Sequence, residues 1–240
     1  MMNKQMNRIG YIIIFVLLLS GCSAEKNLVN TARRIVFFGD SITEQGVKPN
    51  GYVTIIRNSF SERAPSFEIV GAGVSGNKIT DLLARVDKDV LSKRPSIVVI
   101  YIGINDVWHF EFAARGLTGT TKEHFEAGLK ELITKIRSAG AQVVLCTPSV
   151  IGEKNDGTNK EDAMLDAYSA VSRNVASETG ASLCDLRKTF LEYLLLNNPS
   201  NAEKNVVTID GVHLNDSGNQ LVAESIMKVF DGLGLFFPQK

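Results

Sequence analysis

Five short runs of consecutive apolar residues recur along the chain, separated by longer stretches in which apolar residues return every three or four positions. Unbroken apolar runs of this length are typical of strands buried on both faces of a sheet, and the longer period is typical of amphipathic helices. The alternation predicts a βαβα chain with a parallel sheet. The predicted strands are residues 34–38, 67–70, 97–102, 142–146 and 182–186.

The helical pattern is clearest after Thr121, where Gly140 can end the helix and Thr120 with Glu123 predicts a capping box. Apolar residues of this segment share one stripe: Phe125, Leu129, Leu132, Ile133 and Ile136. Other helices are predicted at 52–63, 78–91, 161–178, 187–196 and 217–230. Short right-handed crossovers then predict a three-layer α/β/α sandwich around a five-stranded parallel sheet, with one domain over residues 32–240.

The N-terminal segment has the layout of a signal peptide, because Lys4 and Arg8 precede an uncharged apolar stretch at residues 9–19. An eleven-residue helix is about 16 Å long, roughly half of a hydrocarbon core, which disfavours a transmembrane helix. The end of this stretch, Leu19-Ser20-Gly21-Cys22, resembles the bacterial lipobox. The resemblance implies cleavage after residue 21, lipidation of Cys22 and a tether over residues 22–31.

Acyl chains on Cys22 would hold the protein on a membrane of the bacterial cell envelope. Ser23 follows the cysteine, which by the same resemblance favours the outer membrane in a cell with two membranes. The alternative is a soluble secreted protein in which Cys22 has no such role.

Charge and cysteine content narrow the class of protein further. The 26 basic and 26 acidic residues give no net charge, which argues against a nucleic-acid partner. An apolar fraction of 44% is ordinary for a globular domain and too high for a disordered chain. Cys146 and Cys184 end two separate apolar runs, and we expect buried free thiols there, with a disulfide as the open alternative.

Polar and glycine-rich blocks follow the first three predicted strands, where parallel sheets place their ligand sites. A fourth block precedes the last predicted helix. Because all four would meet at one edge of the sheet, they are the candidate functional site. The blocks are Gly39-Asp40-Ser41-Ile42-Thr43, Gly71-Ala72-Gly73-Val74-Ser75-Gly76-Asn77, Gly103-Ile104-Asn105-Asp106 and Asp210-Gly211-Val212-His213.

A serine nucleophile needs a neighbouring base, and the chain has three histidines. His124 lies beside the apolar stripe of its helix and is expected in solvent. His109 follows Trp108 in a loop, where contact with substrate and a surface role are both open. Asp210 precedes His213 by three residues, so one turn can hold a carboxylate against Nδ1 while Nε2 faces outward. Alone, this short motif is more typical of a surface turn.

The four blocks in this order resemble the SGNH hydrolases, also called the GDSL esterase/lipase family, over nearly the whole mature chain. By that resemblance Ser41 is the nucleophile, His213 the general base and acid, and Asp210 the orienting carboxylate. The resemblance also implies an oxyanion hole made by the amides of Ser41 and Gly76 and the side chain of Asn105. The implied activity is hydrolysis of carboxylic esters by a serine esterase, and no cofactor is implied. No spacing of His, Cys and Asp gives a convincing set of three metal ligands, so no metal is expected.

The sequence departs from the family pattern in two places: the first block reads GDSIT, and Gly71 stands where relatives often carry Asn. Asp40 and Asp106 could be a glycosidase pair, but we expect Asp40 to bond loop amides and Asp106 to start a turn. Rival hypotheses are a flavin or phosphate binder, which gives no reason for Asp210 and His213, and a lipid-tethered ligand-binding module with a decayed site.

Substrate specificity is expected to depend on two insertions, residues 107–119 and 148–160. Trp108, His109 and Phe110 are the candidate pocket residues, although Trp108 could equally anchor the loop in the core. Family relatives act on carbohydrate acetates, small and aryl esters, lysophospholipids and acyl thioesters. The cell envelope suits either sugar deacetylation or lipid-ester cleavage.

Overall fold

A computed structural model describes residues 33–236 of the chain. Its centre is a five-stranded sheet with the strand order β2-β1-β3-β4-β5, in which all neighbouring strands are parallel. The predicted five-stranded parallel sheet is therefore confirmed. The strands are β1 Arg33–Gly39, β2 Phe67–Gly73, β3 Ile97–Tyr101, β4 Gln142–Cys146 and β5 Ser182–Cys184.

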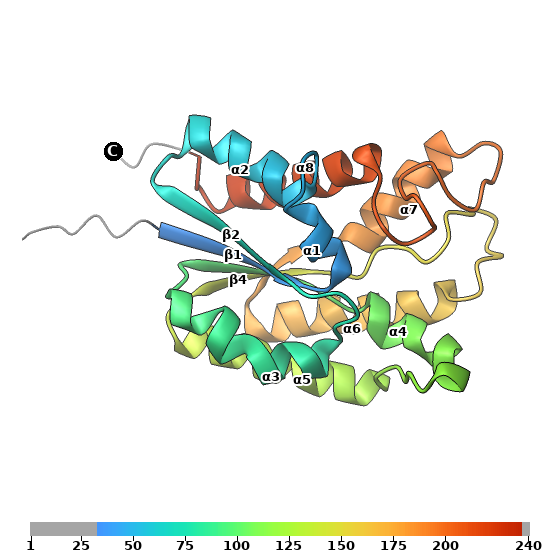
Figure 1. Cartoon of the computed structure of the whole chain (residues 1–240), viewed down its shortest axis with the longest axis horizontal. Helices are drawn as coiled ribbons and strands as arrows, with labels where there is room; N and C mark the ends of the chain where they lie inside the picture. The colour runs from blue at the N-terminus through green and yellow to red at the C-terminus, as the bar shows by residue number, and fades with distance from the viewer. Residues whose placement is uncertain (1–32, 237–240) are drawn as a thin grey trace, which may run out of the picture. The chain divides into compact units, whose positions relative to one another are not determined.

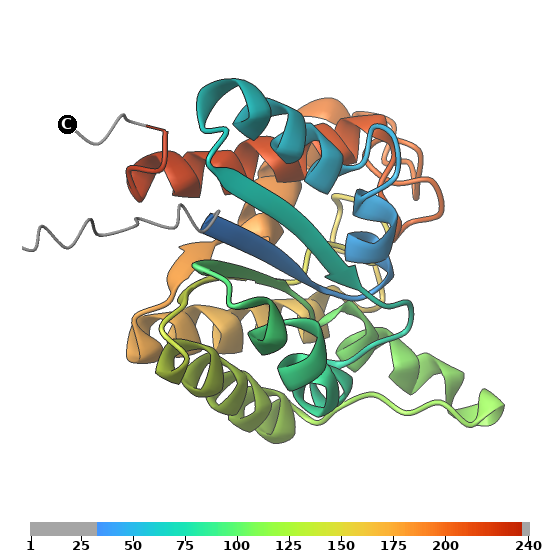
Figure 2. The same cartoon turned by 60° about the vertical axis from the view of Figure 1, so that its left-hand side comes forward.

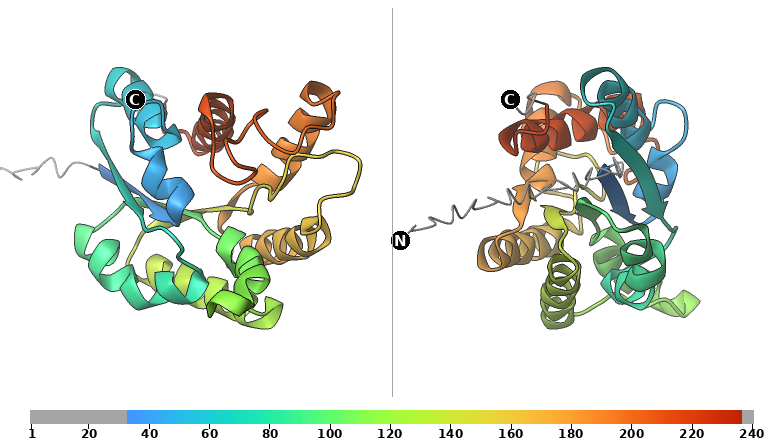
Figure 3. Two further views of the ribbon diagram at one scale, coloured as in Figure 1. Left: turned by 45° about the vertical axis from the view of Figure 1, so that its right-hand side comes forward. Right: turned by 90° about the vertical axis from the view of Figure 1, so that its left-hand side faces the viewer.

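Helices cover both faces of the sheet. Helices α2 and α8 pack together on one face, and α3, α5 and α6 cover the other (Figure 1). The views in Figures 2 and 3 show the same layers from other sides, which confirms the three-layer sandwich. The helices are α1 Ser41–Gly46, α2 Tyr52–Arg63, α3 Ile79–Asp89, α4 Ile104–Trp108, α5 Lys122–Ser138, α6 Asp162–Thr179, α7 Leu186–Asn197 and α8 Asp216–Gly232.

Burial differs between the central and edge strands. All five residues of β3 are buried, as expected for a strand with helices on both sides. Strand β2 lies at the edge of the sheet, and most of its residues are only half-buried. The prediction of a strand buried on both faces therefore holds at the centre and fails at this edge.

Several predicted boundaries shift because of local hydrogen bonds. Strand β5 ends at Cys184, two residues earlier than predicted, because the Asp185 side chain caps α7 by accepting from the Lys188 amide at 3.2 Å. The predicted Thr120 cap of α5 is wrong by one residue. Thr121 is the cap, and its hydroxyl accepts from the His124 amide.

Cys146 and Cys184 are register partners on β4 and β5. Both are buried, and both are free thiols, in agreement with the favoured prediction. Burial raises the pKa of the Cys146 thiol well above its usual range. These residues therefore pack as small apolar side chains in the sheet.

The predicted signal peptide, Cys22 and the tether lie outside the described residues. Among the helices of residues 33–236, none combines the length and hydropathy needed to cross a membrane. The predicted insertion at 107–119 contains the end of α4 and a short 3₁₀ segment, His109–Arg115.

Candidate active site

Ser41 stands at the carboxyl end of β1, where the strand turns directly into α1. Asp40 caps this helix, because its Oδ1 accepts the Ile42 amide at 2.9 Å, as expected from the sequence. Gly39 permits the tight turn, since a Cβ there would collide with the Thr43 hydroxyl of α1 and with the Tyr101 carbonyl oxygen of β3. The turn therefore presents the Ser41 side chain at the sheet edge, where it is only half-buried.

A chain of hydrogen bonds joins Ser41 to the turn before α8. His213 Nε2 lies 3.0 Å from Ser41 Oγ, and His213 Nδ1 lies 2.7 Å from Asp210 Oδ2. With the ring proton on Nδ1, His213 donates to Asp210, and Nε2 can accept the serine proton. The geometry thus brings together the three residues that the sequence singled out as a triad.

The carboxylate of Asp210 also organises its own turn. Its Oδ1 accepts the amides of Val212 at 3.0 Å and His213 at 2.8 Å. Burial acts to raise the pKa of Asp210, but the bonds from the His213 ring and the two amides together hold that pKa below its usual range. The side chain therefore remains ionised beside the imidazole.

Glu153, which the sequence analysis did not single out, anchors the segment leading to this turn. Its fully buried carboxylate accepts the amides of Val206 at 2.7 Å and Val207 at 2.9 Å, together with the Thr208 amide and the Thr208 hydroxyl at 2.6 Å. The sequence signal was an acidic residue just after the apolar pair Val150 and Ile151. Glu153 thus ties the loop after β4 to the segment that carries Asp210 and His213.

The three predicted oxyanion donors lie on neighbouring elements. Ser41 provides the first amide of α1, a position without an intrahelical acceptor. Gly76 has a φ of +75° and is exposed in the loop after β2. Asn105 is 5% exposed, and its Nδ2 donates to the Asn77 carbonyl at 3.0 Å. This bond ties the Asn105 amide to the loop that carries Gly76.

Two further contacts brace the same loop. Glu44 of α1 accepts the Ser75 amide at 2.9 Å, which links the nucleophile helix to the residue before Gly76. Arg85 of α3, another residue that the sequence analysis missed, donates to the carbonyls of Gly39 at 2.7 Å and Ala72 at 2.9 Å and to Asn77 Oδ1 at 2.6 Å. A charged residue at this position is ordinary for an amphipathic helix, so nothing in the sequence indicated this role of Arg85.

Asp106 has a different role from the predicted one. It lies in the first turn of α4, but its fully buried carboxylate accepts the Ile79 amide at 3.1 Å and so caps α3. Burial raises its pKa to about 6 and that of Asp40 to about 7. Because both carboxylates are buried and bonded to backbone amides, their arrangement supports a structural role over a glycosidase pair.

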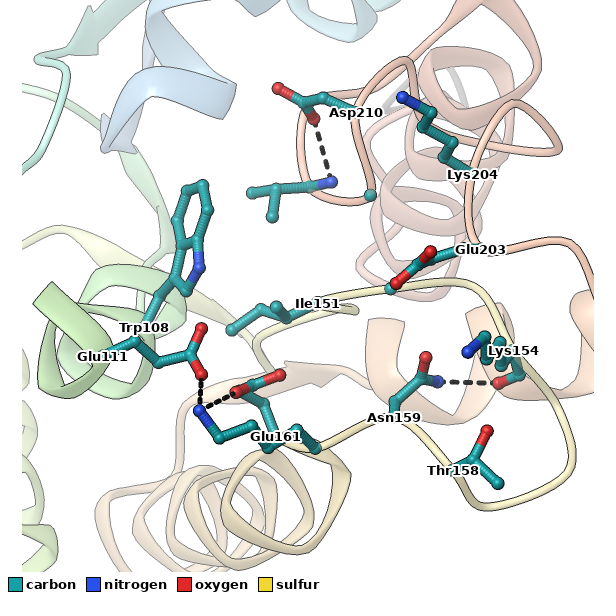
Figure 4. Close-up of a pocket in the computed structure, with 14 residues that line it drawn as sticks. Trp108, Glu111, Ile151, Lys154, Thr158, Asn159, Glu161, Glu203, Lys204 and Asp210 are labelled. Atoms are coloured by element: carbon teal, nitrogen blue, oxygen red, sulfur yellow. Dashed lines mark hydrogen bonds and ion pairs between the residues drawn. The ribbon is translucent and has the colours of Figure 1, made fainter.

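The three predicted pocket residues separate in space. Trp108 lines a cavity of about 430 Å³ that borders the turn at Asp210, Gly211 and Val212 (Figure 4). Phe110 instead lines a neighbouring cavity of about 200 Å³. His109 lines neither cavity and is buried, which lowers the pKa of its ring. Of the three, the structure therefore brings only Trp108 to the cavity beside the triad.

Within residues 33–236, no three His, Cys, Asp or Glu side chains gather closely enough to hold a metal ion. His124 is exposed on α5, as expected. Of the three histidines, His213 is the one within hydrogen-bond distance of the Ser41 hydroxyl.

Comparison with solved structures places the same fold among carbohydrate esterases. A crystal structure of an acetyl xylan esterase, AlAXEase, has a TM-score of 0.77 and 44% sequence identity, covering 81% of this chain and 98% of that one. The structure of an acetylxylan esterase from Geobacillus stearothermophilus has a TM-score of 0.72 and 27% identity, covering 83% and 94%. Three structures of that enzyme are described as catalytic mutants, in which a serine, an aspartate or a histidine is replaced by alanine.

Sequence comparison agrees with the structural one. The Geobacillus stearothermophilus acetylxylan esterase is 28% identical over 83% of this chain and 94% of its own length. An uncharacterised lipoprotein of Bacillus subtilis, YqeF, is 24% identical over 93% of this chain and 96% of its own length. Residues 37–221 match the GDSL-like lipase/acylhydrolase family, which is most of the chain. The chain therefore belongs to the GDSL-like lipase/acylhydrolase family and is a serine esterase that hydrolyses ester bonds.

Proposed function

We propose that this esterase removes acetyl groups from carbohydrate hydroxyls, with Ser41, His213 and Asp210 as its catalytic triad. The observation that carries the proposal is the continuous hydrogen-bond chain from Ser41 Oγ through the His213 ring to Asp210. The substrate class rests on the acetylxylan esterases of similar sequence and fold.

In the acylation step, Ser41 Oγ attacks the carbonyl carbon of the ester and passes its proton to His213 Nε2. Asp210 stabilises the imidazolium that forms. The amides of Ser41 and Gly76 and the side chain of Asn105 donate to the oxygen that becomes negatively charged. His213 then gives its proton to the departing sugar hydroxyl, and an acetyl group remains on Ser41.

Deacylation repeats the same proton transfers with water as the nucleophile. His213 Nε2 accepts a proton from the water that attacks the acetyl-serine carbonyl, and the same donors stabilise the second oxyanion. Collapse of this intermediate returns the proton to Ser41 Oγ and releases acetate. Neutral Asn105 suits this role because it donates without adding a charge beside the base.

The test is acetate release from acetylated xylo-oligosaccharides, with p-nitrophenyl acetate as a minimal ester. Ser41→Ala should abolish turnover of both substrates and labelling by a fluorophosphonate probe. Ser61→Ala, which changes an exposed serine on α2, is the matched control and should retain both. If purified Ser41→Ala retains more than a few per cent of wild-type turnover, the assignment of the nucleophile is wrong.

We also propose that Cys22 carries a lipid that anchors the enzyme to the bacterial cell envelope, at the outer membrane where two membranes are present. The lipobox-like residues Leu19 to Cys22 support this proposal, as does the similarity to a lipoprotein over most of the chain. Intact-mass analysis of the mature N-terminal peptide should find a diacylglyceryl group on Cys22, and Cys22→Ser should lose it. An unmodified Cys22, or cleavage elsewhere, would contradict the anchor without affecting the esterase assignment.

A further inference from the structure

The cavity beside the triad lies on the side of the Asp210 turn where Trp108 stands. It has a volume of about 430 Å³, and Asp210, which borders it, is the hydrogen-bond partner of His213. Figure 4 shows the Trp108 ring on one side of this cavity and Glu203 and Lys204 on the opposite side. The cavity therefore borders the proposed triad at Asp210, two hydrogen bonds away from Ser41 Oγ.

Trp108 offers this cavity a partly exposed aromatic ring. The ring makes an edge contact with Phe112, with the centroids 5.2 Å apart and the planes at 66°. It also packs against the apolar core of the domain. The two roles considered from the sequence are thus combined, since Trp108 is anchored from behind and still lines the cavity.

Charged groups of both signs make up about half of the remaining lining residues. Lys160 pairs with Glu111 and lies 3.9 Å from Glu161. Part of the lining is a loop held by Asn159, whose Nδ2 donates to the Lys154 carbonyl at 2.7 Å. The charged side chains of the whole cavity, apart from Asp210, are Glu111, Lys154, Lys160, Glu161, Glu203 and Lys204.

This lining discriminates between classes of ligand. A long acyl chain would displace water from carboxylates and ammonium groups without replacing their hydrogen bonds, at a high energetic cost. A phosphorylated ligand would meet four carboxylates beside three lysines, so the lining as a whole does not favour an anion. A neutral polyhydroxylated ligand satisfies both kinds of charged group through its hydroxyls, and its C–H face can pack on the indole.

We propose that this cavity binds the sugar chain on the alcohol side of the scissile ester, with Trp108 as its packing surface and Glu111, Lys160 and Glu161 as hydroxyl partners. The inference rests on the proposed carbohydrate esterase function and extends it, because it assigns the residues that select an oligosaccharide over a small ester. Burial, together with the adjacent Glu111, raises the pKa of Glu161 to about 7. Near neutral pH this pair can therefore donate a hydrogen bond as well as accept one.

Binding can be measured without turnover, because Trp108 is the single tryptophan of the chain. Tryptophan fluorescence therefore reports on this cavity. Xylotetraose added to the Ser41→Ala protein should change the fluorescence saturably, and Glu161→Ala in that background should weaken binding about tenfold. Isothermal titration calorimetry of the same protein with xylotetraose provides an independent measure of binding. If neither a fluorescence change nor a heat of binding is found, the proposed subsite is wrong.

Kinetics supply the second test. Trp108→Ala should lower kcat/KM for acetylated xylo-oligosaccharides about tenfold, mainly through KM, and leave p-nitrophenyl acetate within about twofold. Trp108→Phe should recover part of the loss. Met164→Ala, in the neighbouring cavity, is the control and should not distinguish the substrates. Equal losses on both substrates, or no loss on the oligosaccharide, would contradict the proposal.

The two proposals can fail separately. If wild-type enzyme cleaves p-nitrophenyl acetate but releases no acetate from the oligosaccharide, the carbohydrate function fails, whatever xylotetraose does to the fluorescence. If acetate is released but Trp108→Ala behaves as wild type on both substrates, the function stands and the subsite is wrong.

Discussion

Thr208 is held to Glu153 by two hydrogen bonds, from its amide and from its hydroxyl, the latter at 2.6 Å. The same hydroxyl oxygen accepts the Gly211 amide at 2.9 Å, inside the turn between Asp210 and His213. A buried carboxylate after β4 is therefore connected through one side chain to the turn of the proposed triad. The acid–base pair is positioned by a residue that lies outside its own turn.

Replacement of Glu153 should affect both stability and catalysis. Glu153→Ala leaves three amides and a hydroxyl without their acceptor, which should lower the free energy of unfolding by about 3 kcal/mol. It should also lower kcat for p-nitrophenyl acetate, because Asp210 and His213 lose their support. Urea unfolding and steady-state kinetics measure the two effects.

Glu153→Gln keeps an acceptor oxygen and should be affected less than the alanine variant. The matched control is Glu192→Gln, which changes an exposed glutamate on α7 and should behave as wild type. Wild-type stability and kcat in Glu153→Ala would show that the carboxylate does not position the turn.

Asp210→Asn tests the orienting role of the carboxylate. Asparagine retains the size of the side chain but favours the wrong tautomer of His213, so kcat should fall by up to about 10⁴-fold. KM should change little, because Asp210 does not contact the ester in the proposed mechanism. A loss smaller than tenfold, measured with p-nitrophenyl acetate, would argue against Asp210 as the partner of His213.

Asn105→Ala tests the proposed oxyanion donor. Loss of one such donor should reduce kcat by about 10² to 10³-fold, because the donor acts on charge that develops in the transition state. The variant should still react with a fluorophosphonate, more slowly, since Ser41 and His213 remain. Asn58→Ala, an exposed site on α2, serves as the control. If KM rises while kcat stays unchanged, Asn105 contributes to substrate binding in the ground state and not to the transition state.

Asp40 should make stability depend on pH. Burial raises its pKa from 3.8 to about 7, so between these values the folded protein holds a proton that the unfolded chain has released. The contribution of Asp40 to the free energy of unfolding should therefore be largest below pH 3.8 and decrease as pH rises to about 7. The decrease is about 1.4 kcal/mol for each pH unit in that window.

Asp40→Asn should remove this component, because its Oδ1 can still accept the Ile42 amide while no proton is exchanged. Urea unfolding at several pH values should show the variant gaining stability relative to wild type as pH rises. Parallel pH profiles for the two proteins would contradict a raised pKa at Asp40.

Much of the architecture could be predicted from local pattern. The apolar runs identified all five strands because strands between helix layers must be apolar on both faces. The pattern overestimated burial at the two edge strands, β2 and β5, and the length of β5. The Asp210 and His213 contact was also predictable, since three residues within one turn bring a carboxylate to an imidazole. The order of the polar blocks indicated the ester-hydrolase family.

Other features depended on contacts between distant segments, which periodicity does not encode. His213 meets Ser41 across 172 residues only because β1 and the last turn end at the same edge of the sheet. Glu153 and Arg85 have ordinary surroundings in the sequence, and their partners lie on other elements. Trp108 ends α4, and Phe110 lies two positions later in the 3₁₀ segment. The two side chains line different cavities. Packing of whole elements decides which side chain faces the site, because a difference of one or two positions on a helix rotates a side chain to another face.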